Sequence, residues 1–216
     1  ASYPDYEWRT ENRHKNYWDF PTLNDDLASD VARTLEDGWT IYQDERCRAA
    51  LVRLGDFLLL AQMPDPQPGW AQQYDFKTRP IWARKFEPPA LAGRESQDAL
   101  ATLLHIHRLT GDAKYLAPFP RAIEWLKRSR LPDGRLARYY ELRTNKPLYM
   151  TSDYQLTYSD ADAPSHYGWK GSSHIEQLER RFRAAQEGTV PRPTVAKPDE
   201  VRVREILREL DREGRW

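Results

Sequence analysis

The chain lacks the features that mark several classes of protein. Cys47 is the single cysteine among 216 residues, so an internal disulfide is excluded. Neither sign of charge is in excess, because 33 Lys and Arg balance 33 Asp and Glu, and this balance argues against nucleic acid or an anionic membrane as a partner. The mean hydropathy is −0.87 and no long apolar run occurs, which excludes a membrane-spanning helix. Glycine-rich phosphate loops, nucleophile elbows and paired Cys-x-x-Cys motifs are also missing.

The sequence is rich in aromatic residues that have polar neighbours in the chain. It contains eight Trp and twelve Tyr. The segment 69–91, GWAQQYDFKTRPIWARKFEPPAL, gathers two Trp, a Tyr and two Phe beside amides and both charges, without an apolar period. Aromatic rings often pack in a core, but Trp beside Gln, Asp and Arg in a loop-like segment suits stacking on sugar faces. We therefore expect a sugar-binding wall, with Trp70 or Trp82 exposing a ring face and Arg84 pointing into the same space.

Periodic apolar positions predict four helices, over residues 23–38, 44–62, 93–111 and 113–130. We expect Asn24 to cap the first helix and Gly111 to end the third. Two prolines near the start of the fourth predict that it begins late. The Tyr-rich run 136–150 predicts a β-hairpin or an extended loop around TNKP.

The four helices form a repeat with an offset of 68 residues. Asp30 matches Asp98 at this offset, and Asp44 matches Asp112. Each unit reads as loop, helix, turn, helix and polar aromatic loop; a chance likeness between amphipathic helices is the alternative. Repeated αα-hairpins with long loops at one end predict an all-α fold, an incomplete α/α toroid with a short β-hairpin.

The chain divides into two parts on this interpretation. Residues 1–170 form the toroid domain, and 171–216 form a helical extension with helices over 172–186 and 198–214, joined by a Pro-rich connector. The last helix carries an apolar stripe that includes Val201 and Leu207. We expect it to dock on the body of the molecule rather than on a separate partner.

The loops of such a fold would meet around one cleft. Arginine forks pair with carboxylates, carboxylates hold hard cations such as Ca²⁺, and flat rings stack on pyranoses. Their combination points to an acidic polysaccharide; salt bridges between loops over packed aromatics are the alternative. The candidates are the cations Arg84, Lys85, Arg138, Arg143 and Lys146, the carboxylates Asp25, Asp26, Asp75, Glu87 and Glu141, and the rings of Trp70, Tyr74, Trp82, Tyr139 and Tyr140.

These motifs carry a resemblance to a known family. The series NDD, GWAQQYD, RPIWARKFEPPAL and ARYYELRTNKPLY resembles the pectate lyases of polysaccharide lyase family 10, over roughly Leu23 to Asp153. The resemblance implies an α/α toroid that cleaves polygalacturonate by Ca²⁺-assisted β-elimination. It also implies that an N-terminal third of the usual module is absent.

The resemblance assigns roles to individual residues. Asp25 would be the calcium ligand, with Asp26 as the alternative. Arg84 and Arg138 would bind substrate carboxylates. The remaining cleft residues implied by the resemblance are Trp70, Gln73, Tyr74, Asp75, Trp82, Tyr140, Glu141, Asn145 and Lys146.

The chain departs from the family pattern at the position of the base. Catalytic members carry SGRD after TNRP, and its Arg is the proposed base, whereas MTSD here leaves Ser152 in that position. A Ser hydroxyl alone is no base for a C5 proton. Either Lys146, Lys85 or Tyr139 takes its place, with a pKa lowered by neighbouring cations, or the chain binds without cleaving.

Two hypotheses from different classes therefore stay open. The first is a calcium-dependent lyase of polygalacturonate or a related uronan, and the second is a noncatalytic uronan-binding protein. Both expect a protein that is secreted or periplasmic, with no nucleic acid or membrane partner. Oligomeric state is not indicated by the sequence.

Overall fold

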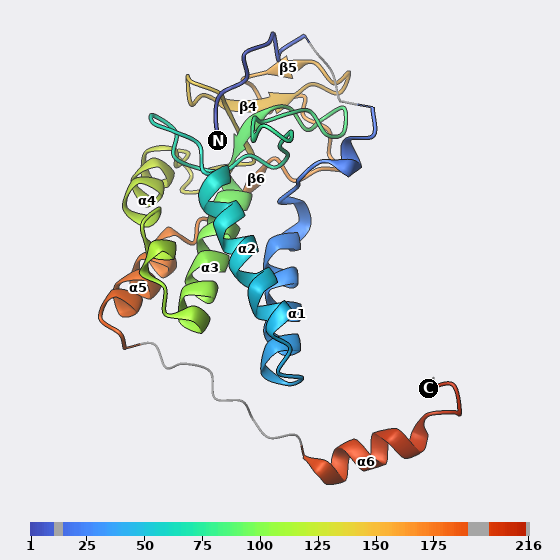
Figure 1. Ribbon diagram of the computed structural model, residues 1–216. Helices are drawn as coiled ribbons and strands as arrows, with labels where there is room; N and C mark the ends of the chain where they lie inside the picture. Colours follow the sequence, from blue (N-terminus) through green and yellow to red (C-terminus); the bar gives the residue numbers. More distant parts are fainter. Residues whose placement is uncertain (11–14, 190–198, 215–216) are drawn as a thin grey trace.

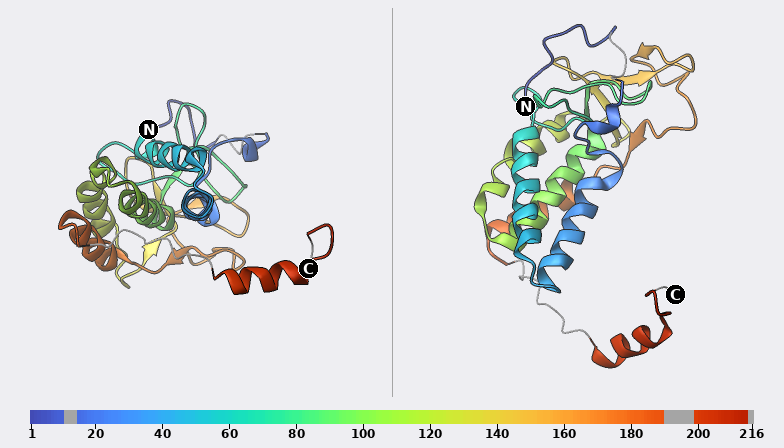
Figure 2. Two further views of the ribbon diagram at one scale, coloured as in Figure 1. Left: turned by 60° about the horizontal axis from the view of Figure 1, so that its bottom comes forward. Right: turned by 45° about the vertical axis from the view of Figure 1, so that its right-hand side comes forward.

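The computed structural model describes residues 1–10, 15–189 and 199–214. Five helices gather at one end of the body, and the strands and long loops gather at the other end (Figure 1). Two further views show the same division, with α1 (Leu27–Thr40) and α2 (Glu45–Ala61) lying beside α3 (Gly93–Thr110) (Figure 2).

Two consecutive helical hairpins form the helical end. Helices α1 (Leu27–Thr40) and α2 (Glu45–Ala61) pair first, and α3 (Gly93–Thr110) and α4 (Phe119–Arg128) follow, with a short 3-10 turn, Ala113–Leu116, between the latter two. The residues Asp44 and Asp112, which match at the 68-residue offset, each accept a hydrogen bond from the backbone N–H two residues later. The repeated Asp therefore caps the element that follows the turn in each hairpin, which is α2 in the first and the 3-10 turn in the second. The late start of α4 is confirmed.

Helix α3 lies at the centre of the core. It contacts α1, α2, α4 and α5, and its Leu100, Leu103 and Ile106 are fully buried. Gly111 ends the helix with a φ of 73°, as the sequence predicts. Because α3 is packed on several sides, its first turn is held firmly at the end of the molecule that carries the strands.

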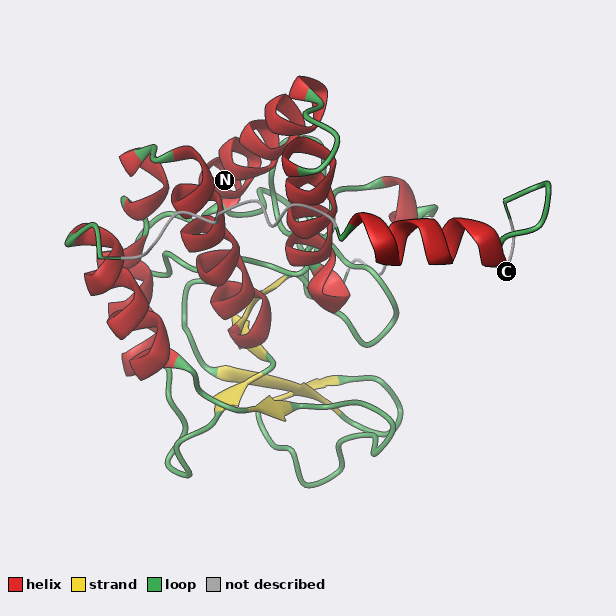
Figure 3. Ribbon diagram, turned by 90° about the horizontal axis from the view of Figure 1, so that it is seen from below, coloured by secondary structure: helices red, strands yellow, loops and turns green. Residues whose placement is uncertain are grey.

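Two antiparallel sheets cover that end (Figure 3). The larger sheet has four strands in the order β1 (Ala90–Ala92), β3 (Tyr139–Glu141), β4 (Pro147–Met150) and β5 (Leu156–Thr157). The smaller pairs β2 (Leu136–Ala137) with β6 (Lys170–Gly171). The predicted hairpin is confirmed as the pair of β3 and β4. A Cβ at Gly93 would lie 2.5 Å from the carbonyl oxygen of Ala137, so glycine lets the start of α3 approach β2 closely.

The prediction of an all-α fold, an α/α toroid, is wrong for this chain. The described residues combine helices with two antiparallel sheets, so the fold is mixed. The physical reason is that the segments after α2 and α4, expected as loops, pair with each other through β1 and β3 and satisfy their backbone groups as a sheet.

The C-terminal part begins with α5 (Ile175–Gln186), which contacts α3 and α4. Phe182 of α5 stacks on Phe119 of α4 with ring centroids 4.8 Å apart. Helix α6 (Glu200–Glu209) leaves Val201 and Leu207 exposed, and the connector 190–198 lies outside the described residues. The division at residue 170 and the docking of α6 stay predictions. Among the described residues, no helix has the length and apolar character needed to cross a bilayer.

Candidate functional site

Two neighbouring cavities open at the sheet end, near the first turn of α3. One has a volume of about 440 Å³ and is lined by Arg138, Arg94, Asp26 and Asp98; we call it the Arg138 cavity. The other, of about 370 Å³, is lined by Trp18, Asn24, Asp25 and Arg84; we call it the Trp18 cavity. Arg138 connects them, because it lines the first and donates hydrogen bonds to Asn24 and Gln72, which line the second.

Arg138 is the most buried cation of this region, with a side chain only 10% exposed. One terminal nitrogen serves three acceptors, at 3.2 Å from Asn24 Oδ1, 3.1 Å from Gln72 Oε1 and 3.2 Å from Glu95 Oε1. The guanidinium also lies 4.6 Å from the centre of the Tyr167 ring. One nitrogen of Arg138 is therefore shared between two neutral amide oxygens and one carboxylate oxygen, and none of these hydrogen bonds is short.

Glu95, the counter-charge of Arg138, is incompletely satisfied. Its side chain is fully buried, and among the described residues its Oε2 has no hydrogen-bond partner. Burial raises the pKa of Glu95 above its ordinary value, although Arg138 partly offsets that effect. Arg138 Nε likewise has no hydrogen-bond partner among the described residues, so Arg138 retains a donor for another anion.

Arg84 and Glu87 form a different kind of pair. Arg84 Nε lies 2.9 Å from Glu87 Oε2, its terminal nitrogen lies 2.5 Å from Oε1, and its backbone N–H also donates to Oε2. Tyr167 adds a fourth hydrogen bond to Glu87. Burial opposes ionisation of Glu87, but the hydrogen bonds from Arg84 more than offset it, so the pKa of Glu87 lies below its ordinary value. One edge of the Arg84 guanidinium is thus occupied by its own loop.

The two aspartates predicted to hold calcium separate at the entrance to α1. The predicted cap by Asn24 is not formed: a 3-10 turn, Asn24–Asp26, precedes the helix, and Asp25 and Asp26 have φ values of 53° and 59°. As a result Asp25 lines the Trp18 cavity and Asp26 lines the Arg138 cavity. Asp26 pairs with Arg94 at 2.6 Å. Burial and the neighbouring Asp26 raise the pKa of Asp98 to about 7.

These aspartates alone do not make a calcium site. Ca²⁺ takes six to eight oxygen ligands. In the part of the chain that the structure describes, no three His, Cys, Asp or Glu side chains come together as metal ligands. Asp25 and Asp26 face different cavities, and Asp26 is already neutralised by Arg94.

Several predicted wall residues are core residues. Trp70 is fully buried and its Nε1 donates to the carbonyl of Leu58 at 2.8 Å. Trp82 is also buried and donates to the carbonyl of Trp8. Tyr74 and Tyr140 are fully buried as well, and burial raises the pKa of each. The prediction that Trp70 or Trp82 exposes a ring face is therefore wrong, because each finds a backbone acceptor inside the core.

The polar residues of the segment and of the hairpin mostly brace the loops. Asp75 accepts hydrogen bonds from Arg79, and Gln73 donates to the carbonyls of Tyr17 and Phe20. Glu141 is buried and pairs with Arg9.

Asn145 joins the hairpin to α4. Its Oδ1 accepts from Trp125 Nε1 at 2.7 Å and from Gln67, and its amide donates to Ser129. Of the four bracing residues Gln73, Asp75, Glu141 and Asn145, Gln73 lines the Trp18 cavity and the other three line neither cavity.

The predicted candidates for the base do not line either cavity, although the hydroxyl of Tyr139 donates to Gln72, which lines the Trp18 cavity. Ser152 is exposed and its Oγ donates to Asp162 at 3.0 Å. Lys85 lies 3.7 Å from the centre of the Tyr154 ring, and Lys146 lies 5.0 Å from that of Tyr158. Burial raises the pKa of Tyr139 well above its ordinary value, which is the wrong direction for a base at neutral pH. None of these four residues lines the Arg138 cavity or the Trp18 cavity.

Sequence reasoning missed Trp18, Glu95 and Asp98 as members of the site. Trp18 is 66% exposed and lines the Trp18 cavity beside Tyr17. The signal for Trp18 was present, since a Trp in a polar segment stands just before NDD. Asp98 lies one helical turn after Glu95, so both carboxylates share the face of α3 that meets the cleft.

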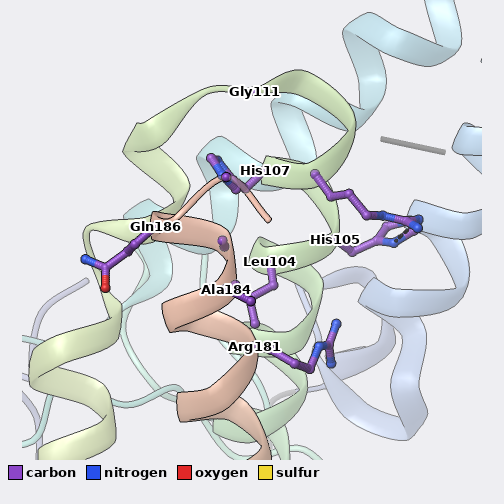
Figure 4. A pocket seen from close by; sticks show the side chains of 10 residues that line it. Leu104, His105, His107, Gly111, Arg181, Ala184 and Gln186 are labelled. Carbon is purple, nitrogen blue, oxygen red and sulfur yellow. Dashed lines mark hydrogen bonds between the residues drawn. The ribbon is translucent and has the colours of Figure 1, made fainter. Parts of the chain in front are cut away.

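A larger cavity, of about 820 Å³, lies at the opposite end of α3, between α3 and α5 (Figure 4). It is lined by His105, His107 and Arg181 among others. Arg108 lies 13 positions after Glu95, a separation of about 20 Å along a helix axis. We therefore place the candidate site in the two smaller cavities, where the predicted residues Asp25, Arg84 and Arg138 meet.

Comparison with known proteins gives structural matches alone. No family model matches the sequence, and no curated protein sequence matches it. The fold resembles that of a family 10 polysaccharide lyase from Cellvibrio cellulosa, an aspartate-to-alanine mutant in complex with trigalacturonic acid, with a TM-score of 0.64 and 19% identity over 81% of this chain. A second structure of the family 10 lyase from the same organism matches with a TM-score of 0.64 and 18% identity over 82% of this chain. The chain spans 64% and 65% of the lengths of these structures.

Proposed function

We propose that this chain is a polysaccharide-lyase-like protein that binds an acidic polysaccharide of the polygalacturonate type and cleaves it by β-elimination. The observation that carries the proposal is the position of Arg138, a buried guanidinium at the junction of two cavities whose counter-charge is incompletely satisfied. The likeness to lyases from Cellvibrio, one of them in complex with trigalacturonic acid, supports the substrate class.

The chemistry assigned to Arg138 is electrostatic. The C5 proton of a galacturonate lies next to its carboxylate, and pairing of that carboxylate with a guanidinium stabilises the negative charge that develops when the proton leaves. A base then removes the proton, the C4–O4 bond breaks, and a C4=C5 double bond forms. Arg94 lines the same cavity, but it is paired with Asp26, so the main charge offered to the carboxylate is that of Arg138.

A second candidate function is binding of a uronan without cleavage. A specific observation favours it: Ser152, Lys85, Lys146 and Tyr139 all lie outside the lining of the cavities. On this account Arg138 holds the uronate, and none of these four base candidates takes its C5 proton.

One experiment separates the two functions. The protein is mixed with polygalacturonate at alkaline pH, with and without Ca²⁺, and the ultraviolet absorbance of unsaturated uronides is followed while binding is measured by calorimetry. Absorbance that rises with time supports the lyase. Binding without absorbance supports the second candidate, and the absence of both contradicts the proposal.

Calcium belongs to this proposal as a cofactor of the substrate-loaded cleft. Because the described residues form no complete site, the uronan would supply most of the oxygen ligands, and Asp25 or Asp26 would contribute a carboxylate. Calorimetry should then show that Ca²⁺ and oligogalacturonate each strengthen the binding of the other. Independent binding of the two would contradict the shared site. Secretion or export to the periplasm stays a prediction.

A further inference from the structure

The two cavities differ in the charges that line them. Three cations, Arg94, Arg138 and Lys170, line the Arg138 cavity against two carboxylates, Asp26 and Asp98. The Trp18 cavity has the opposite balance, since Arg84 is its one lining cation and Asp25 and Glu87 are its lining carboxylates. A second uronate carboxylate is therefore disfavoured in the Trp18 cavity by like charge.

The single cation of the Trp18 cavity is already paired within its own loop. Nε and one terminal nitrogen of Arg84, which form one edge of the guanidinium, donate to Glu87 at 2.9 and 2.5 Å. Glu87 is buried and also accepts from Tyr167, so removal of Arg84 toward a ligand would leave a buried carboxylate without its counter-charge. Asp25, which is exposed, then sets the local field.

The same cavity offers a flat apolar surface. Trp18 is the one tryptophan in the described part of the chain that exposes more than half of its surface, at 66%. Tyr17 packs against it at 5.3 Å and an angle of 70° between the rings, and Leu27, partly exposed, lines the cavity nearby. A ring fixed by a neighbour at the mouth of a cavity binds a sugar face with little loss of side-chain freedom.

We propose that the Trp18 cavity is a subsite for an uncharged pyranose, stacked on Trp18 with its hydroxyl groups directed to Asp25, next to a uronate held at Arg138. The uncharged ring is a neutral sugar or a methyl-esterified uronate, which share the absence of a carboxylate. This proposal rests on the proposed function, and it specifies the substrate as a polymer in which charged and uncharged rings are neighbours. Replacement of the uncharged ring by a free uronate brings its carboxylate toward Asp25 and Glu87.

The test compares three oligosaccharides of equal length by calorimetry. They are a fully acidic oligogalacturonate, a partly methyl-esterified one, and one in which galacturonate alternates with neutral rhamnose. Each is titrated into the wild type, Trp18→Ala and a control, Tyr42→Ala. Tyr42 is 80% exposed at the far end of α1, so its replacement removes an exposed ring without touching either cavity.

We expect Trp18→Ala to weaken binding of at least one mixed oligosaccharide about tenfold, and that of the acidic one less than about twofold. Whichever mixed ligand shows the effect identifies the uncharged ring. Equal losses for acidic and mixed ligands, or no loss, would overturn the subsite. Failure of the wild type to bind the acidic oligosaccharide is a separate result, which would contradict the proposed function itself.

Discussion

The candidate site contains two arginine–glutamate pairs, Arg84 with Glu87 and Arg138 with Glu95, and their hydrogen bonding differs. Arg84 and Glu87 lie three residues apart in one loop, and Nε and a terminal nitrogen of Arg84 each donate to a different oxygen of Glu87. Arg138 lies between β2 and β3, and Glu95 lies in α3. One terminal nitrogen of Arg138 is shared among three acceptors. The pKa of Glu87 is lowered, whereas burial raises that of Glu95. The first pair is a complete brace, and the second retains capacity for another anion.

The comparison favours Arg138 over Arg84 as the ligand of a uronate. The charge of Arg84 and its place in the segment 69–91 suggested that role, but one edge of its guanidinium is bonded to its own loop. Arg138 was predicted for the same role, and its geometry is compatible with it.

The largest effect is expected for Arg138→Ala. Removal of Arg138 leaves Glu95 buried without a counter-charge, which costs about 3–5 kcal/mol of the free energy of unfolding. Urea denaturation measures the loss. The double variant Arg138→Met with Glu95→Gln removes both charges and should recover most of the stability while failing to bind oligogalacturonate. A single variant as stable as the wild type would show that Arg138 does not compensate Glu95.

A smaller effect on stability is expected for Arg84→Lys. Lysine keeps the charge but loses the fork, and Arg84 is 39% exposed, so after solvent screening the loss is about 1 kcal/mol. Binding of oligogalacturonate should be unchanged within about twofold. The control is Arg46→Lys, because Arg46 pairs with Asp44 through the same two nitrogens, Nε and Nη2, on the open surface, where little change is expected. Weaker uronan binding with unchanged stability would restore Arg84 as a ligand.

The pH dependence of stability should separate the two pairs. The folded pKa of Glu95 lies above the ordinary value of 4.5, so its contribution to stability is complete below that pH and is lost as pH rises toward the folded pKa. The folded pKa of Glu87 lies below 4.5, so its contribution is present above that pH and is lost as pH falls through the folded pKa.

Glu95→Gln and Glu87→Gln should therefore depart from the wild type in opposite ways. The first should lose less stability than the wild type as pH rises above 4.5, and the second should be less stable than the wild type at neutral pH and approach it in acid. Urea denaturation at a series of pH values measures both. Parallel profiles for the two variants would contradict the difference between the pairs.

The sequence predicted the elements with strong local signals. Apolar periodicity located α1 to α5, TNKP located the hairpin, and Gly111 ended α3. It did not predict β1, since Ala90–Ala92 has little strand propensity and is a strand only because β3 pairs with it.

The candidate site was also predicted only in part, because side-chain burial depends on contacts that the sequence does not show. The repeat and the loop motifs placed Asp25, Arg84 and Arg138 near one another, and the cavities bear this out. The burial of Trp70 could not be read from its polar neighbours, because its indole N–H is satisfied by a carbonyl of α2 that lies twelve residues away in the chain. Whether an aromatic ring faces a ligand or the core depends on such contacts.

The measurement that tests the central claim most directly is the affinity for trigalacturonate of two matched variants, Arg138→Lys and Arg84→Lys. Each keeps its charge and loses its fork, so stability can be checked separately and affinity compared per folded molecule. The account predicts that Arg138→Lys weakens binding about tenfold or more and that Arg84→Lys changes it less than about twofold. The reverse order, or equal losses, would contradict the assignment of Arg138 as the uronate-binding arginine.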